Sequence, residues 1–172
     1  KEVAWRALRD RQGGLRPNDF PDTDLATWIG RVAGLEDAPL QGALAPYDCR
    51  NNRLAVLALE QDGFAESVRG AAARYGAGRI GLFLGTSTSG IWETERAYLT
   101  RPARDTPLPA TLRFRNTQAN FSVAECVQNA LGLSGPALVM STACSSSAKV
   151  FASAQRAMKA DLCDAAVVGG VD

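Results

Sequence analysis

The stretch PALVMSTACSSSAKVFASAQRAMKADLCDAAVVGG, residues 136–170, has two short apolar runs with a longer segment of helical spacing between them. The runs over 136–141 and 164–170 have the length of buried strands. Between them, one apolar stripe recurs at helical spacing, formed by Val150, Phe151, Ala154, Ala157 and Met158. A strand, a helix and a strand within so short a span form a βαβ unit, with parallel strands and a right-handed crossover. The sequence therefore predicts an α/β fold, a mainly parallel sheet covered by helices.

Helices and strands also alternate along the rest of the chain. Strands are predicted over 27–32 and 79–85, and helices over 1–14, 50–61, 64–75, 90–99 and 120–131. The first helix has one apolar face, formed by Val3, Ala4, Ala7 and Leu8, and should end at Gly13-Gly14. Neither repeats nor low-complexity segments mark an internal boundary, so residues 1–172 are predicted to form one domain.

Composition narrows the class of protein. The chain has 172 residues, 46% of them hydrophobic and 22% charged, which is typical of a globular protein with a sizeable core. Its net charge of +1 gives no general attraction to nucleic acid or to a membrane surface. No apolar run is long enough to cross a bilayer, and the first residues do not resemble a signal peptide. We therefore expect a cytoplasmic protein with neither nucleic acid nor membrane as its partner.

The four cysteines lie far apart, at Cys49, Cys126, Cys144 and Cys163, and no CxxC pair occurs. This spacing favours free thiols over a disulfide framework. The sequence contains no histidine, so a metal site is not expected, and nothing in the chain calls for a cofactor.

Cys144 stands where the first strand of the βαβ unit ends and its helix begins. Open α/β sheets bind ligands at this edge, and a helix N-terminus stabilises an anion there by roughly 1 kcal/mol. Ala143 and the three serines that follow Cys144 are small, and they would leave an acyl carbon room to approach. The turn would act like a nucleophile elbow, although the G-x-S-x-G signature is absent. Cys144 could equally be a small core residue, and its position alone does not decide between the two.

The segment STACSSSAKVFASAQRAMKADLCDAAVVGGVD (141–172) strongly resembles the active-site region of the β-ketoacyl-acyl carrier protein synthases. LGTSTSGI (84–91) is similar to a glycine-flanked loop of that family, and GLSGPALVMSTAC (132–144) to the strand that leads to its nucleophile. VAWRALRDRQGGL (3–15) resembles the family's first helix. In detail the sequence looks most like the branch found in aryl-polyene and related type II polyketide pathways.

The resemblance implies a thiolase-like fold in which Cys144 is the catalytic residue. Cys144 would take an acyl group from a carrier-protein thioester, and the enolate formed by decarboxylation of malonyl-carrier protein would then attack it. The backbone N–H of Cys144 would be one of two oxyanion donors. The family's two histidines and its lysine lie downstream of this motif. We therefore expect residues 1–172 to be the N-terminal part of a ketosynthase domain, without its first strand and C-terminal half, and to be inactive alone.

Two further positions would bind substrate if the resemblance holds. Thr88 falls where a larger side chain often gates the family's acyl pocket, although 85–90 could also be an ordinary strand-to-helix loop. Its glycine spacing is Walker-like, but Ile91-Trp92 replaces the Lys-Ser/Thr that binds phosphate. Phe114 lies in the segment that reaches across the family's dimer interface, which would put it near the partner's pocket. The sequence over 112–121 departs there from the usual Pro/Ser/Asn pattern.

The partners implied are an acyl carrier protein, carrying acyl and malonyl thioesters, and a second subunit in a homodimer or a ketosynthase heterodimer. Scattered arginines could meet an acidic carrier protein or simply form a solvated face: Arg50, Arg101, Arg104, Arg113 and Arg115. The pathway would be fatty acid or polyketide biosynthesis. One alternative is a thiolase or other acyltransferase of the same fold. Another is a non-condensing partner subunit, which typically lacks the nucleophile.

Overall fold

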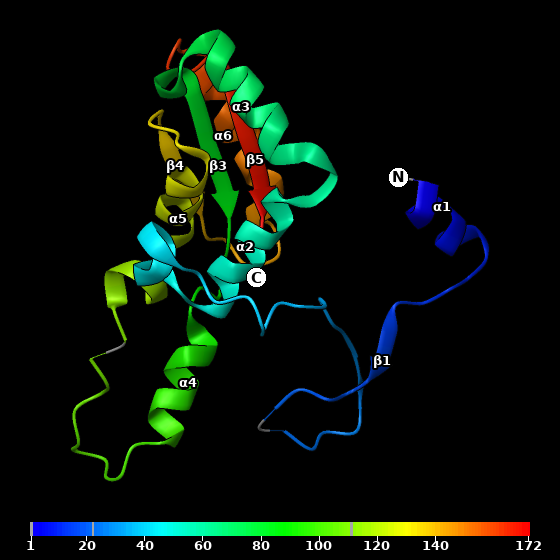
Figure 1. The fold of residues 1–172 in the computed structure, drawn as a ribbon, viewed down its shortest axis with the longest axis vertical. Helices are drawn as coiled ribbons and strands as arrows, with labels where there is room; N and C mark the ends of the chain where they lie inside the picture. The colour runs from blue at the N-terminus through cyan, green and yellow to red at the C-terminus, as the bar shows by residue number, and fades with distance from the viewer. Residues whose placement is uncertain (1, 22, 111) are drawn as a thin grey trace. The chain divides into compact units, whose positions relative to one another are not determined.

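The structure is a computed structural model that describes residues 2–21, 23–110 and 112–172. The chain divides into two compact units, one ending at Gly34 and the other spanning Leu35–Asp172. The first unit contains helix α1 (Glu2–Arg9) and an antiparallel pair, β1 (Leu15–Pro17) with β2 (Trp28–Gly30) (Figure 1). Strand β2 lies within the predicted range 27–32. Strand β1 was not predicted, because it has three residues and one of them is a proline, which cannot donate to a strand ladder.

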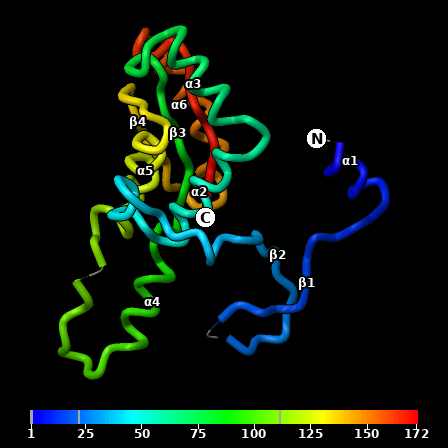
Figure 2. The backbone as a smooth tube through the Cα atoms, in the orientation of Figure 1, coloured from blue at the N-terminus to red at the C-terminus, as the bar shows by residue number. Residues whose placement is uncertain are grey.

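A three-stranded parallel sheet forms the centre of the second unit. Its order is β4 (Ala137–Met140), β3 (Ile80–Gly85) and β5 (Ala165–Gly170). Strand β3 lies between the two strands of the predicted βαβ unit. The parallel pairing and the α/β class are confirmed, and all three strands end at the same edge of the sheet (Figure 2).

Helices cover both faces of this sheet (Figure 1). Helix α6 (Ser146–Lys159) packs on one face, and α2 (Arg50–Leu59), α3 (Phe64–Tyr75) and α5 (Ser122–Leu131) form the other layer. Because side chains alternate along a strand, β3 serves two cores. Ile80, Leu82 and Leu84 join the cluster beneath α2, α3 and α5, while Phe83 packs with Val150 of α6. Every residue of β3 is buried, as its continuous apolar run predicted.

The predicted stripe of α6 is only partly buried in the structure. Val150, Ala154 and Ala157 pack against the sheet, whereas Phe151 and Met158 remain 60% and 46% exposed. Those two side chains lie at one margin of the stripe and line an open hollow beside β5. The predicted helix is confirmed, and only part of its apolar stripe is buried.

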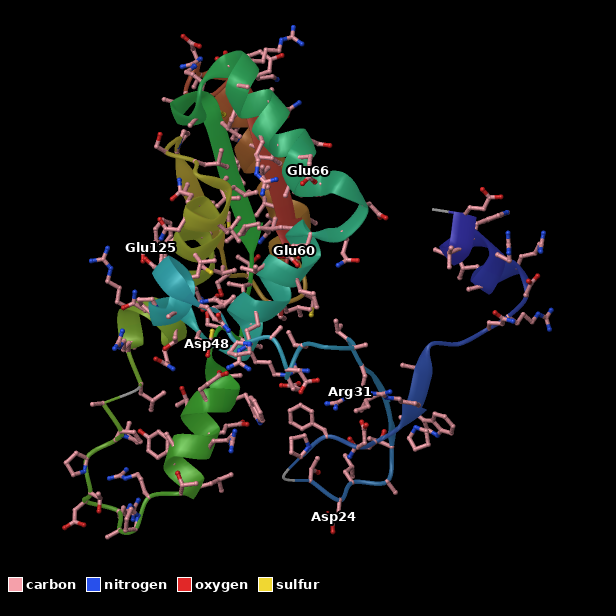
Figure 3. All side chains as sticks on the ribbon, viewed as in Figure 1. Asp24, Arg31, Asp48, Glu60, Glu66 and Glu125 are labelled. Atoms are coloured by element: carbon pink, nitrogen blue, oxygen red, sulfur yellow. The ribbon has the colours of Figure 1, made fainter. Side chains whose placement is uncertain are left out.

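The remaining elements connect these layers. They are the short helices η1 (Gly42–Tyr47), η2 (Gln61–Gly63) and η3 (Ala77–Arg79), helix α4 (Ile91–Leu99), and the π-helical turn η4 (Phe114–Gln118). Asp48, labelled in Figure 3, fixes the start of α2. Its carboxylate accepts hydrogen bonds from Arg53 Nε at 2.6 Å and from the Leu40 N–H at 3.0 Å. Within the three described ranges, no helix is both long enough and apolar enough to span a bilayer.

Candidate active site

Cys144 lies in a short turn between Met140, the last residue of β4, and Ser146, the first residue of α6. The hydroxyl of Ser146 accepts a hydrogen bond from the Thr142 N–H at 2.8 Å and donates one to the Ala143 carbonyl at 2.7 Å. Ala143 itself has φ +52°, in the left-handed region that residues with a side chain rarely adopt. These features hold a tight turn, and the thiol of Cys144 is exposed at its tip.

Two glycines let the start of α6 approach the sheet. A Cβ atom on Gly85, at the end of β3, would lie 2.6 Å from both the carbonyl carbon of Ser146 and the nitrogen of Ser147. A Cβ atom on Gly170, at the end of β5, would lie 1.8 Å from Ser147 Oγ. The first turn of α6 therefore rests directly on the ends of β3 and β5. This contact places Cys144 at the carboxyl edge of the sheet, as the sequence predicted.

This arrangement suits a nucleophile that carries an acyl group. The first N–H groups of a helix have no intrahelical partner, so they and the helix dipole favour negative charge at this end. An exposed thiol there can attack a carbonyl carbon while a backbone N–H stabilises the oxyanion. Within the described part of the chain, no group of three or more Asp, Glu, Cys or His side chains is placed to hold a metal ion.

The other three thiols belong to the core. Cys49, Cys126 and Cys163 are all buried. Burial raises the pKa of Cys49 to about 11 and that of Cys126 to about 12. Both therefore remain protonated at neutral pH, and neither is suited to nucleophilic attack.

Thr88 lies in the loop that follows β3, and an aspartate at the end of β5 holds this loop. The Asp172 carboxylate accepts hydrogen bonds from the N–H groups of Ser87 and Thr88, at 2.7 and 3.0 Å, and from the Thr88 hydroxyl at 3.0 Å. Burial alone would raise the pKa of Asp172, but the hydrogen bonds from Ser87, Thr86 and Thr88 outweigh it and lower the pKa. Sequence analysis did not single out Asp172. The sequence did contain a signal for it. Polar residues, Thr86 and Asp172, follow two apolar runs that form parallel strands, and the carboxyl ends of parallel strands meet at one edge of the sheet.

Phe114 begins the π-helical turn η4, and its side chain is 75% exposed. The segment that carries it contacts the loop of Thr88, because the Gly90 N–H donates to the Thr117 carbonyl at 2.9 Å. The Ser89 hydroxyl also donates to Asn120 Oδ1 at 2.7 Å. The structure therefore brings the loop of Thr88 and the segment of Phe114 together, while the ring of Phe114 faces solvent.

Three of the five arginines considered for a carrier protein make contacts within the described part of the chain. Arg50 Nε lies 2.9 Å from Glu36 Oε1, and an Arg115 terminal nitrogen lies 2.9 Å from Glu125 Oε1. A third, Arg101, stacks over the ring of Tyr98 at 5.5 Å from its centroid. These three arginines therefore contribute to contacts within the chain.

An apolar cavity of about 230 Å³ lies on the face of the sheet opposite α6. Its walls come from α2, α3, α5, β3, β5 and the residue that follows β5, and they include Leu59, Val127 and Val171. Cys144 and Thr88 do not line this cavity, so it is separate from the candidate site.

Comparisons with known proteins cover most of the chain. The sequence model described as "Beta-ketoacyl synthase, N-terminal domain" matches residues 46–172. A search of curated proteins found no match. Among solved structures, a ketosynthase (ApeO) in complex with its chain length factor (ApeC) from Xenorhabdus doucetiae is similar at 27% identity and a TM-score of 0.71. The alignment covers 98% of this chain and 42% of that one.

A second solved structure shares the fold. It is the oxazolomycin ketosynthase domain OzmH KS7 from Streptomyces albus JA3453, at 20% identity and a TM-score of 0.64. That alignment covers 99% of this chain and 32% of the other. The chain thus spans less than half the length of both proteins.

Proposed function

Because the chain belongs to the β-ketoacyl synthase family, matching its N-terminal domain, we propose that it takes part in decarboxylative condensation with Cys144 as the acylated nucleophile. The observation that supports this most is the exposed thiol of Cys144 on a hydrogen-bonded turn at the N-terminus of α6. Its substrates would be acyl and malonyl thioesters on an acyl carrier protein.

In the first step, the Cys144 thiolate attacks the acyl carbonyl of the carrier-protein thioester. A new carbon–sulfur bond forms, and the bond to the carrier's sulfur breaks, so the carrier leaves as a thiolate that takes up a proton. The negative charge of the tetrahedral intermediate lies on the former carbonyl oxygen, where the Cys144 N–H at the start of α6 can donate to it.

In the second step, the malonyl thioester loses carbon dioxide, and the electrons of the broken carbon–carbon bond form an enolate. The enolate carbon attacks the carbonyl of acylated Cys144 and expels the Cys144 thiolate. The 172 residues contain no histidine. We therefore propose that the two histidines and the lysine used by the family for this step come from residues beyond these 172.

Two residues would contact the acyl chain or the partner subunit. Thr88 follows β3 at the same edge of the sheet as Cys144, and its short side chain would leave room for a long acyl tail. Phe114 has an exposed ring on a segment that is hydrogen-bonded to the loop of Thr88, so it is available to a partner subunit.

The assembly would be a homodimer or a heterodimer of ketosynthase subunits. The similar ApeO structure is a ketosynthase in complex with its chain length factor, which supports a heterodimer for this chain too. Within such a pair, the exposed Cys144 favours the condensing subunit, since a non-condensing partner typically lacks the nucleophile.

The test is an assay of the full-length protein with acyl-carrier protein and malonyl-carrier protein. We expect release of carbon dioxide and a β-ketoacyl-carrier protein of the summed mass, both lost in Cys144→Ala. Products formed from coenzyme A thioesters without release of carbon dioxide would indicate a thiolase instead. Activity that persists in Cys144→Ala would contradict the role proposed for this thiol.

A further inference from the structure

The segment Thr86–Thr88 is held in the structure by one side chain from a distant part of the sequence. Five hydrogen bonds reach the Asp172 carboxylate from this segment, three from hydroxyls and two from backbone N–H groups. Oδ1 accepts four of them, and Oδ2 accepts the fifth from the Ser87 hydroxyl at 3.1 Å. A carboxylate with so many donors is committed to holding the segment and is poorly suited to act as a base.

The ends of the loop have other anchors. Thr86 is fully buried, and its hydroxyl accepts a hydrogen bond from Asn51 Nδ2 of α2 at 3.3 Å. At the other end, Ser89 donates to Asn120, and the Gly90 N–H donates to the Thr117 carbonyl. Ser87 and Thr88 lie exposed between these anchors. Asp172 therefore fixes the middle of the loop, where Thr88 stands.

The loop and the nucleophile share one edge of the sheet. Gly85, just before the loop, touches the first turn of α6, and Gly170, two residues before Asp172, touches Ser147 of the same turn. The Thr86 N–H also donates to the Met140 carbonyl at 3.1 Å, at the end of the strand that leads to Cys144. The loop of Thr88 and the turn of Cys144 therefore follow neighbouring parallel strands at the same edge of the sheet.

The strength of these hydrogen bonds depends on the negative charge of Asp172. Hydrogen bonds to a charged group are roughly twice as strong as those between neutral groups. The donors lower the pKa of Asp172 in spite of its burial, so the carboxylate stays ionised at neutral pH. An asparagine of the same shape would lose the charge and would turn an N–H₂ group toward one of the donors.

We propose that Asp172 is a positioning residue for acyl-chain selectivity: its carboxylate fixes Ser87 and Thr88, and Thr88 thereby forms a defined wall of the acyl site. The inference rests on the proposed function, because it assumes that Cys144 is acylated and that the acyl tail passes Thr88. It assigns Asp172 no contact with the reacting atoms.

The test compares Asp172→Asn with Asp164→Asn in the full-length protein. Asp164 directly precedes β5 and accepts a hydrogen bond from Arg79 Nε at 2.7 Å, so the control removes a carboxylate at the opposite end of the strand from the loop. The rate of acylation at Cys144 is measured with acetyl, hexanoyl and dodecanoyl pantetheine thioesters. The wild type and Thr88→Phe are measured alongside.

We expect Asp172→Asn to lower the rate with the dodecanoyl thioester about tenfold more than with the acetyl thioester, since only a long chain reaches the loop. Asp164→Asn should leave that ratio unchanged. An equal loss at all chain lengths in Asp172→Asn, or no loss, would overturn the inference while acylation of the wild type upholds the proposed function. If the wild type is not acylated by any of the three thioesters, the proposed function fails, and this inference fails with it.

Discussion

Gly85→Ala should displace the turn that carries Cys144. The added Cβ atom would lie 2.6 Å from the carbonyl carbon of Ser146 and 2.6 Å from the nitrogen of Ser147. Both are backbone atoms, so no side-chain rotation relieves the clash, and the end of β3 must separate from α6. Overpacking of this kind costs about 1–3 kcal/mol. We expect the melting temperature of the full-length protein to fall by several degrees and alkylation of Cys144 by iodoacetamide to change in rate.

Gly169→Ala is the matched control. Gly169 pairs with Leu84 in the β3–β5 register, one position from the pair of Gly85 with Gly170. Its added Cβ atom would meet only Leu84 Cδ2, at an ordinary distance of 3.9 Å. We expect the melting temperature to change little. If Gly85→Ala is as stable as Gly169→Ala and Cys144 reacts at the wild-type rate, the close contact of β3 with α6 is refuted.

A variant of a third glycine, Gly170→Ala, distinguishes a clash with a side chain from a clash with the backbone. In Gly170→Ala the new Cβ atom would lie 1.8 Å from Ser147 Oγ and 2.7 Å from Ser147 Cβ. Removal of that side chain in the double variant with Ser147→Gly should therefore restore part of the lost stability. The same second change should not rescue Gly85→Ala, whose nearest contacts are backbone atoms. Rescue of both variants, or of neither, would contradict this geometry.

Three other outcomes follow from the site and its surroundings. Native protein treated with a thiol reagent should react first at the exposed Cys144, and Cys49 and Cys126 should react only on unfolding, because burial raises their pKa values to about 11 and about 12; peptide mass mapping gives the order. Thr88→Phe should slow acylation by long acyl thioesters roughly tenfold while sparing short ones, and an equal loss at all lengths would mean that Thr88 does not border the acyl chain. At Asp48, burial favours a higher pKa, but the hydrogen bonds from Arg53 and Leu40 outweigh it, so its pKa is lowered on folding. The stability that Asp48 contributes is therefore complete above the ordinary carboxyl pKa of about 4 and is lost as the pH falls through its lowered value. Thermal melts between neutral and acid pH should show a smaller acid loss in Asp48→Asn than in the wild type.

The sequence predicted most reliably the elements whose signal is local. Helix α3 begins and ends at the predicted residues, Phe64 and Tyr75, where glycines stand on either side of a helical apolar pattern. Strand β3 was evident from a continuous apolar run, because a strand buried on both faces needs no polar alternation. The position of Cys144 followed from the same logic, since the end of a strand and the start of a helix are both visible in the sequence.

Two features that depend on distant residues were not predicted. The turn η4 has π-helical hydrogen bonding, and its backbone is fixed by contacts with Gly90 and Asn52, which lie far away in the sequence. The hydrogen bonds from Thr88 to Asp172 require β3 and β5 to be parallel neighbours. They also require a register in which the last residues of the two strands are paired. A sequence reading can place both residues at one edge, but hydrogen-bond partners follow only from the register.

The most direct measurement is the site of acylation. The full-length protein, incubated with an acyl-carrier protein, is digested and its peptides are analysed by mass spectrometry. The account predicts that the acyl mass appears on the peptide that contains Cys144 and is absent from Cys144→Ala. An acyl group found on Cys49, Cys126 or Cys163, or acylation that persists in Cys144→Ala, would contradict it.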